Sequence, residues 1–271
     1  MRSPTPHDYA AALATVRDLV GEAERQAGAS DERRVGVATP GSISANTGRI
    51  RNANSLWLND RPFREDLSAM LGAPVRMAND ANCLALSEAI DGAAAGAMVV
   101  FAAILGTGCG GGVAVDGRVI EGANAIAGEW GHTPLPWPNA EEHPGPVCWC
   151  GRHGCLELYI SGTGFETDYR RLYGRKLLGA EIAAAARQGE PHAEAALTRY
   201  VERLGRGLAV ICNIIDPDVI VLGGGMSNLP ELYVRVPAEI ARWIFSDVLA
   251  TRVVPARHGD SSGVRGAAML W

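Results

Sequence analysis

The sequence predicts an α/β fold, because segments of strand character alternate with segments of helical periodicity along its 271 residues. The composition is that of an ordinary globular protein, with 47% hydrophobic and 20% charged residues. A chain of this length is expected to form one large domain or two modest ones. We expect two: a small N-terminal α/β domain over 1–96 and a larger C-terminal α/β domain over 97–271.

The N-terminal part alternates helices with strands. Apolar residues recur at helical spacing behind a candidate N-cap, Asp8, and a β-rich run is stopped by Pro40-Gly41. A later helix is entered at Pro62, and a strand meets a helix at Asn79-Asp80. The predicted elements are a helix over 9–20, a strand over 34–38, a helix over 59–71, a strand over 74–78 and a helix over 80–90.

In the C-terminal part, the alternation of strands and helices begins again after the small residues at 92–96. Asp116-Gly117 is a hairpin signal. Residues 122–155 are rich in Pro, Gly and Trp, and a loop this long usually needs a function or a clamp. The predicted elements are strands over 98–105, 112–115 and 119–121, a mainly helical stretch from 157, a helix over 191–215, a strand over 219–222 and a further helix after a glycine triplet.

Charge and hydropathy exclude several classes of function. The formal net charge is −5 and no basic cluster stands out, so nucleic acid is not the expected partner. Residues 1–14 lack the apolar core of a secretory signal, and the longest apolar run, 97–105, is too short to span a bilayer as a helix. We therefore expect a cytoplasmic protein with no membrane partner.

Cysteines cluster in one segment. Three of the six lie within eight residues, at Cys148, Cys150 and Cys155, and His132 lies at the other end of the Pro-rich loop. Three Cys and one His make a complete tetrahedral zinc shell with no position left for water, so such a zinc would be structural. The C-x-C-x4-C spacing is not that of a zinc finger. The alternative is a set of unliganded cysteines beside a surface residue, His153.

Two glycine-rich segments follow predicted strands. In the first, 106–112, backbone amides and the Thr107 hydroxyl could bind phosphate oxygens, and a tight β-hairpin is the alternative. In the second, 223–225, a flat ligand such as adenine could lie on the backbone, and helix–strand packing is the alternative. A P-loop is excluded because the only lysine, Lys176, does not follow a glycine, and neither segment fits a dinucleotide motif.

Three carboxylates are candidate functional groups. Asp80 at the strand-to-helix corner is either an N-cap or a general base that takes the proton of a hydroxyl as a phosphoryl group arrives. Glu129 and Glu157 flank the predicted zinc loop. Either alone could be a solvated acid, but a pair held by a metal clamp suits the capture of sugar hydroxyls.

These motifs, in this order, resemble the ROK family (repressors, open reading frames and kinases) of bacterial sugar kinases over essentially the whole chain. The two most specific are Glu-x-Gly-His at 129–132 and Cys-x-Cys-Gly-x2-Gly-Cys-x-Glu at 148–157. Stretches such as NDANCLALSEAIDGAAAGA and DPDVIVLGGGMSN are similar to the fructokinase (mannofructokinase) branch. That branch implies ATP-dependent phosphorylation of D-fructose to fructose 6-phosphate, with mannose or glucose as other substrates.

The resemblance implies a two-domain actin-like, hexokinase-type ATPase fold of RNase H-like domains, with the hexose and ATP in the cleft between them. Asp80 is implied as the catalytic base. The implied sugar contacts are Gly41, Asn79, Asp80, Glu129, His132 and Glu157. The implied ATP contacts are Gly106, Thr107, Gly108, Gly110, Gly111, Gly112, Gly223, Gly224 and Gly225.

Two metals follow from the same resemblance. Mg²⁺ would accompany ATP and neutralise the transferred charge. A structural zinc would be held by His132, Cys148, Cys150 and Cys155, and the second ring nitrogen of His132 would face the sugar. Family members are often dimers, so the resemblance also allows a homodimer.

The sequence departs from the family pattern at its start. Family members begin with a strand carrying an Asp-x-Gly-Gly-Thr phosphate loop, and no such motif precedes Pro4. About 25 residues, three strands of about 5 to 6 residues plus turns, are expected to be absent. This predicts an incomplete first domain, an unpaired edge on the strand at 34–38 and a half-built phosphate site. The alternative functions are therefore an inactive sugar-binding fragment and, less favoured without a helix-turn-helix segment, a sugar-responsive repressor.

Overall fold

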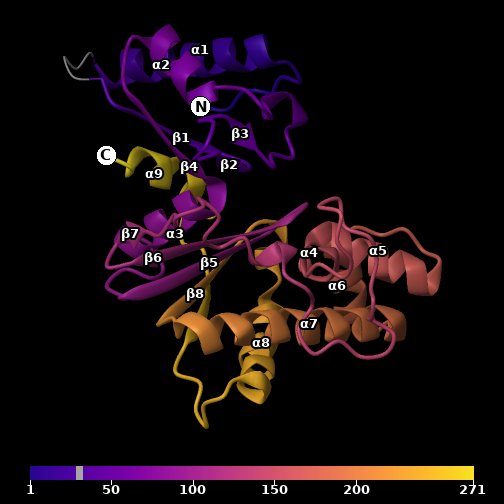
Figure 1. Cartoon of the computed structure of the whole chain (residues 1–271). Coiled ribbons are helices and arrows are strands. Elements are labelled where there is room, and N and C mark those ends of the chain that lie inside the picture. The colour runs from indigo at the N-terminus through magenta and orange to yellow at the C-terminus, as the bar shows by residue number, and fades with distance from the viewer. Residues whose placement is uncertain (29–32) are drawn as a thin grey trace.

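The computed structural model describes residues 1–28 and 33–271. It contains two small two-stranded sheets in the N-terminal part and a five-stranded sheet, with the helix α3 (Asp80–Ile90) between the N-terminal part and the larger sheet (Figure 1). Helices pack on sheets in both parts of the chain, so the predicted α/β class is confirmed. Among the described residues, no helix combines the length and apolarity that crossing a bilayer requires.

The N-terminal part has its own apolar core, in which Leu67 and Ile50 are almost fully buried. The helix α1 starts after Asp8, whose side chain accepts a hydrogen bond from the backbone N–H of Ala11, as its N-cap position predicts. The elements are α1 (Tyr9–Ala27), β1 (Val35–Thr39), β2 (Ser42–Ile43), β3 (Ile50–Arg51), the 3₁₀ turn η1 (Leu56–Leu58), α2 (Phe63–Leu71) and β4 (Val75–Asn79).

The helix α2 begins at Phe63, four residues later than the predicted start at 59. The Asn59 side chain accepts from the backbone N–H of Ala53 and donates to the carbonyl of Ala53, both at 2.9 Å. These two bonds hold residue 59 in an extended conformation. The helix therefore begins only after Pro62, which has no backbone N–H to donate.

The strands β1 and β4 pair in parallel, and β2 pairs antiparallel with β3. Within residues 1–28 and 33–271, β4 is the one strand that pairs with β1. The parallel pairing puts Thr39 opposite Asn79, so the carboxyl ends of both strands meet at the corner that leads into α3. The expectation that further family strands belong before Met1 stays a prediction.

The larger sheet has the order β7-β6-β5-β8-β9. The first three strands form an antiparallel meander, whereas β8 and β9 add in parallel to β5. Their bounds are β5 (Val99–Leu105), β6 (Cys109–Val115), β7 (Arg118–Val119), β8 (Val219–Gly223) and β9 (Arg252–Pro255).

The strand β6 begins at Cys109, three residues before its predicted start, because Gly110, Gly111 and Gly112 pair with Ile104, Ala103 and Ala102 of β5. The predicted strand at 119–121 is shorter than expected, since β7 ends at Val119.

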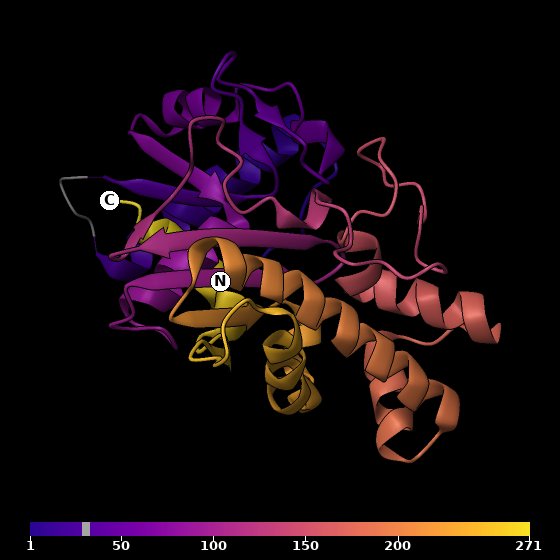
Figure 2. The ribbon, with the colours of Figure 1, turned by 60° about the horizontal axis from the view of Figure 1, so that its bottom comes forward.

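Helices cover the larger sheet and extend beyond one end of it, with the long helix α7 running alongside (Figure 2). Both ends of α7 match their predicted positions, since Pro191 sets the start and Asp216, in the left-handed region at φ 43°, ends it. The helices are α4 (Glu157–Ile160), α5 (Gly162–Tyr173), α6 (Gly179–Arg187), α7 (Pro191–Ile215), α8 (Pro230–Trp243) and α9 (Ser262–Ala268), with 3₁₀ turns η2 (Trp130–His132), η3 (Gly225–Asn228) and η4 (Gly259–Ser261).

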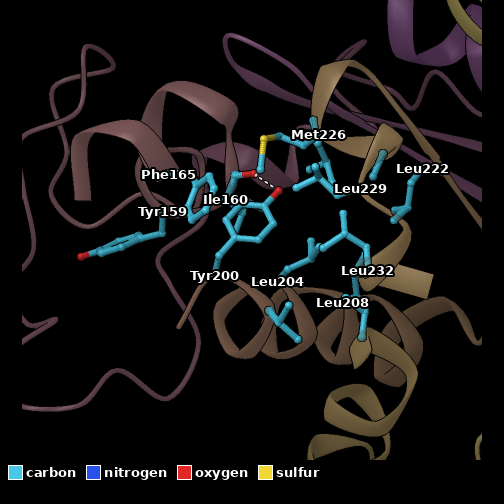
Figure 3. Packing of buried hydrophobic residues seen from close by; sticks show 14 of the residues in the cluster. Tyr159, Ile160, Phe165, Tyr200, Leu204, Leu208, Leu222, Met226, Leu229 and Leu232 are labelled. Carbon is cyan, nitrogen blue, oxygen red and sulfur yellow. Dashed lines mark hydrogen bonds between the residues drawn. The ribbon is translucent and has the colours of Figure 1, made fainter. Parts of the chain in front are cut away.

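The main apolar core fixes the short helix α4. Tyr200 of α7 is buried, and its hydroxyl donates a hydrogen bond of 2.8 Å to the carbonyl of Ile160, the last residue of α4 (Figure 3). Phe165 and Met226 pack in the same cluster (Figure 3). Because α4 begins at Glu157, this core positions a predicted site residue.

The helix α3 contacts both parts of the molecule. Leu84 and Ala85 join a core with strands of the larger sheet, whereas Cys83 packs with Ala267 of α9. The last helix, α9, returns to lie beside β1 (Figure 1). At Gly266 an added Cβ would lie 1.8 Å from the carbonyl oxygen of Cys83, so this close approach requires glycine. The division at residue 97 stays a prediction.

Candidate active site

The four predicted zinc ligands lie together. Their ligating atoms are all within 4.8 Å of one another. Cys150 Sγ is 3.5 Å from Cys155 Sγ, and Cys148 Sγ is 3.7 Å from His132 Nδ1. Zinc–sulfur bonds of about 2.3 Å in a tetrahedron put neighbouring sulfurs about 3.8 Å apart. The donor set and its spacing therefore fit a structural zinc.

A tight turn presents the thiols. The backbone N–H of Cys148 donates to the carbonyl of Arg152 at 2.7 Å, and Gly151 has a positive φ of 86°. Hydrogen bonds from the Arg152 backbone and the neighbouring thiols outweigh burial and lower the pKa of Cys150 to about 6. The thiolate is the form that binds metal. His153 is exposed and its Nδ1 lies 3.3 Å from the carbonyl of Gly145, so it stands outside this group.

The rest of the long loop is held by buried ion pairs. Glu142 is 6% exposed; its carboxylate accepts from Arg203 Nε at 2.8 Å and from one Arg206 nitrogen at 2.9 and 3.0 Å. Arg206 also donates to the carbonyls of Pro136 and Trp137. Both arginines lie on α7, so the loop is tied to the main core as well as to the metal group.

Glu157 joins this loop to the glycine hairpin. Its Oε2 accepts from the backbone N–H of Cys109 at 2.9 Å, and its Oε1 accepts from Trp149 Nε1 at 2.8 Å. At Gly108 an added Cβ would lie 2.7 Å from Glu157 Oε2, so any larger residue would push the carboxylate away. Glycine at 108 therefore leaves room for the Glu157 carboxylate in its observed position.

The strand-to-helix corner is capped by Asn79 rather than by Asp80. Asn79 Oδ1 accepts from the backbone N–H of Ala81 at 2.8 Å, and its Nδ2 donates to the carbonyl of Gly41 at 3.0 Å. Asp80 is the first residue of α3, and burial raises its pKa against the lowering effect of a hydrogen bond from Ala81. Asp80 Oδ1 also accepts from the backbone N–H of Ala81, at 2.9 Å, and its role as a base stays a prediction.

Glu129 lies close to the other candidate groups. Burial raises its pKa, as do the negative charges of Asp80 and Glu157, while His132 acts in the opposite direction. An ionised carboxylate only accepts hydrogen bonds, so a cluster of them is suited to a ligand that donates several. A sugar with many hydroxyl groups is such a ligand.

Some glycines of the two glycine-rich segments are required by close packing, and others lie at the surface. The hairpin tip is short, with Gly106 donating to the carbonyl of Gly108 and Thr107 exposed. Gly111 and Gly112 are strand residues whose added Cβ atoms would meet the backbones of Gly128 and Ala81. The β-hairpin alternative is therefore the observed conformation, and the phosphate contacts stay a prediction.

In the second glycine segment an added Cβ at Gly223 would meet Leu84, and one at Gly224 would meet the backbone of Leu105. Only Gly225 of the three has open space on that side. Packing therefore accounts for the first two glycines, and adenosine binding at 223–225 stays a prediction.

Two residues that sequence reasoning missed also belong to this region. Trp149 donates to Glu157 and its ring lies edge-on to His132, with centroids 4.8 Å apart. Trp130 is buried and donates from Nε1 to the carbonyl of Gly110 at 3.0 Å. The signal available in the sequence was a tryptophan inside each of the two most specific motifs.

Comparison with known proteins places this site in a family. The ROK family model matches residues 1–271. The chain is 41% identical over 274 residues to an N-acetyl-D-glucosamine kinase of Escherichia coli O1:K1, covering 99% of this chain and 90% of that protein. It is similar to the solved ROK hexokinase of Thermus thermophilus, with a TM-score of 0.86 and 34% identity over 98% of this chain and 88% of that one.

A further solved relative is a ROK glucokinase of Streptomyces griseus in complex with glucose and AMPPNP. It has a TM-score of 0.82 and 26% identity, with 100% of this chain and 90% of that chain covered. These matches confirm the hexokinase-type fold expected from the motifs. The chain belongs to the ROK family.

Proposed function

We propose that this protein is an ATP-dependent sugar kinase whose preferred substrate is N-acetyl-D-glucosamine, with glucose as the second candidate. The observation that carries the proposal is the convergence of Asp80, His132 and Glu157 on Glu129, with Glu157 bonded to the glycine hairpin. The relatives with the highest identity among those described above are a kinase and a hexokinase, so a non-catalytic sugar-binding role is not favoured.

The choice of sugar departs from the fructose expected from the sequence stretches. Eight curated relatives at 41% identity carry the description N-acetyl-D-glucosamine kinase. The Streptomyces griseus relative is described with glucose bound. These descriptions favour N-acetylglucosamine or glucose over fructose.

In the proposed reaction, Asp80 accepts the proton of a sugar hydroxyl while its oxygen forms a bond to the γ-phosphorus of ATP. The bond from that phosphorus to the β–γ bridging oxygen breaks, and ADP leaves. The raised pKa of Asp80 suits this role, because a more basic carboxylate takes a proton more readily. Mg²⁺, bound with ATP, would supply charge neutralisation at the phosphates.

The remaining residues orient the sugar. Asn79 fixes the turn at Gly41 through its side-chain amide, which places that backbone beside the base. Glu129 and Glu157 would accept hydrogen bonds from sugar hydroxyls. The Nδ1 edge of His132 faces Cys148, which would leave Nε2 for the sugar once a metal fixes the ring.

A coupled assay of ADP release with Mg-ATP tests the proposal, using N-acetylglucosamine, glucose, fructose and mannose in parallel. We expect the highest kcat/KM for N-acetylglucosamine, with a sugar phosphate detected by phosphorus NMR. No phosphorylated product from any of the four sugars would contradict the proposal, and a preference for fructose would restore the earlier expectation.

A further inference from the structure

A groove of about 650 Å³ lies between the segment around β3 and the zinc loop. Its N-terminal wall is formed by residues between 44 and 60, including Asn52, Ala53, Asn54 and Leu56. Among the described residues that line it, Trp149 alone comes from the C-terminal part of the chain. The groove is therefore closed on one side by a single large aromatic side chain.

Trp149 is held in place although it is 62% exposed. It stands between Cys148 and Cys150, donates to Glu157 and contacts the edge of His132. A tryptophan this exposed is unusual in a position so well fixed, since large aromatic side chains are mostly buried. A rigid, exposed indole is suited to contact with a ligand.

The groove lies next to the proposed sugar site. Gly41, which is bonded to Asn79, has φ of 75° and packs against Arg51 and Ala53; an added Cβ would lie 2.4 Å from the Arg51 carbonyl oxygen. On the opposite side, Trp149 touches Glu157 and His132. The groove thus adjoins the site both at the Gly41 turn and at the zinc loop.

The lining of the groove combines apolar carbon with amide groups. Leu56 supplies apolar surface and is 75% exposed, whereas Ala53 is buried. Asn52 and Asn54 are exposed amides at the same place, each with a donor and an acceptor. An acetamido group has matching parts: a methyl, an N–H and a carbonyl oxygen.

We propose that Trp149 is a specificity-determining residue and that its indole and the Asn52–Leu56 wall receive the acetamido group of an N-acetylhexosamine. This inference rests on the proposed kinase function and adds the place where the substituent is recognised. The indole ring would contact the acetamido methyl, while its N–H keeps Glu157 aligned for the hydroxyls common to all hexoses.

The two roles of the indole predict different effects for two substitutions. Trp149→Phe keeps an aromatic ring but loses the N–H donor, so KM should rise for N-acetylglucosamine and glucose by similar factors. Trp149→Ala loses both the aromatic ring and the N–H donor. The ratio of kcat/KM for N-acetylglucosamine to that for glucose should therefore fall about tenfold, as for a lost apolar contact. Trp137→Ala is the matched control, because Trp137 is an exposed tryptophan of the same loop that stacks on Trp243 and does not line the groove.

Leu56→Ala tests the same groove without touching the zinc loop. It should lower the N-acetylglucosamine to glucose ratio while leaving glucose turnover unchanged. An unchanged ratio in both Trp149→Ala and Leu56→Ala would overturn the inference, and equal losses for both sugars would reduce Trp149 to a structural role.

Calorimetric binding of the two sugars to the zinc-loaded wild-type protein and to these variants separates this inference from the proposed function. Selective loss of N-acetylglucosamine binding in Trp149→Ala and Leu56→Ala supports the groove even if the wild type transfers no phosphate. Equal binding of both sugars by all of these proteins contradicts the groove even if the protein is an active kinase.

Discussion

The carboxylate of Glu157 accepts a hydrogen bond of 2.9 Å from the backbone N–H of Cys109, a residue 48 positions earlier in the chain. This bond joins the first residue of α4 to the first residue of β6. The other carboxylate oxygen is bonded to Trp149 of the zinc loop. One side chain therefore couples the metal group, the glycine hairpin and the proposed sugar site. A structural change in any one of the three should alter the other two.

Replacing Asp80 by Asn should separate binding from chemistry. The amide keeps the size of the side chain but cannot accept the proton, so kcat should fall by about 10²- to 10⁴-fold. Sugar affinity measured by calorimetry should change little. Asp116→Asn, at the β6–β7 turn, is a control that should keep full turnover. A fully active Asp80→Asn variant would remove Asp80 from the role of base.

The pH dependence of kcat/KM should show an acid limb set by buried carboxylates. Burial raises the pKa of Asp80 above 3.8 and that of Glu129 above 4.5. Both are expected to act when ionised, so the group with the higher pKa sets the acid limb and activity should rise with pH through a midpoint above 4.5. A midpoint at or below 4.5 in initial-rate measurements would show that ionisation of Glu129 does not limit the reaction.

Glu88 should make stability depend on pH. It is fully buried on α3, and burial by itself raises its pKa. Four hydrogen bonds to the carboxylate have the larger, opposite effect and lower the pKa. The donors are the backbone N–H groups of Ala93, Arg257 and His258 and the hydroxyl of Ser262. A lowered pKa in the folded state means that the stabilisation is complete above the unfolded value, 4.5, and is lost as pH falls through the folded value.

Urea unfolding of wild type and Glu88→Gln at neutral and acid pH measures this effect. The substitution should lower the free energy of unfolding by about 2–3 kcal/mol at neutral pH, as expected for hydrogen bonds to a charged group. The difference should shrink below pH 4.5. Ser262→Ala, which removes one donor, should give a smaller loss. A difference that is the same at both pH values would contradict the ionised role of Glu88.

Glu142→Gln should destabilise the fold strongly. The substitution leaves Arg203 and Arg206 buried without their shared negative partner. Removing one member of a buried ion pair costs about 3–5 kcal/mol. Its exposed neighbour gives the control, since Glu141→Gln should stay within about 0.5 kcal/mol of wild type. Chemical unfolding monitored by circular dichroism checks both, and a near-neutral Glu142→Gln would show that the loop does not depend on this network.

Local signals in the sequence were sufficient for the regular elements. The strand before Asn79 and the helix after it were predicted because a capping residue follows a β-rich run, and Pro191 marked the start of α7. The β6 strand was predicted too short because Gly110 and Gly111 were interpreted as part of a loop. Their strand conformation depends on pairing with β5 and on the close approach of Ala81 and Gly128, which no local pattern encodes.

The same limit applies to the site. The metal group was predictable because its ligands follow a chemical rule of number and spacing. Glu88 and Glu142 gave no signal, since each depends on at least one partner more than 60 residues away. Trp149 stood inside a predicted motif, but its contacts with Glu157 and the groove depend on how the zinc loop folds against the N-terminal part.

The most direct test of the zinc-organised site is to measure sugar affinity as a function of bound metal. Protein stripped with a chelator and then reloaded in steps would be assayed for zinc by elemental analysis and for N-acetylglucosamine binding by calorimetry, with Cys150→Ser as the variant that cannot be reloaded. We predict about one zinc per chain when loaded, affinity that falls as zinc is removed and recovers as it returns, and weak binding by Cys150→Ser. Zinc-free protein that binds the sugar as tightly as the loaded form would contradict the account.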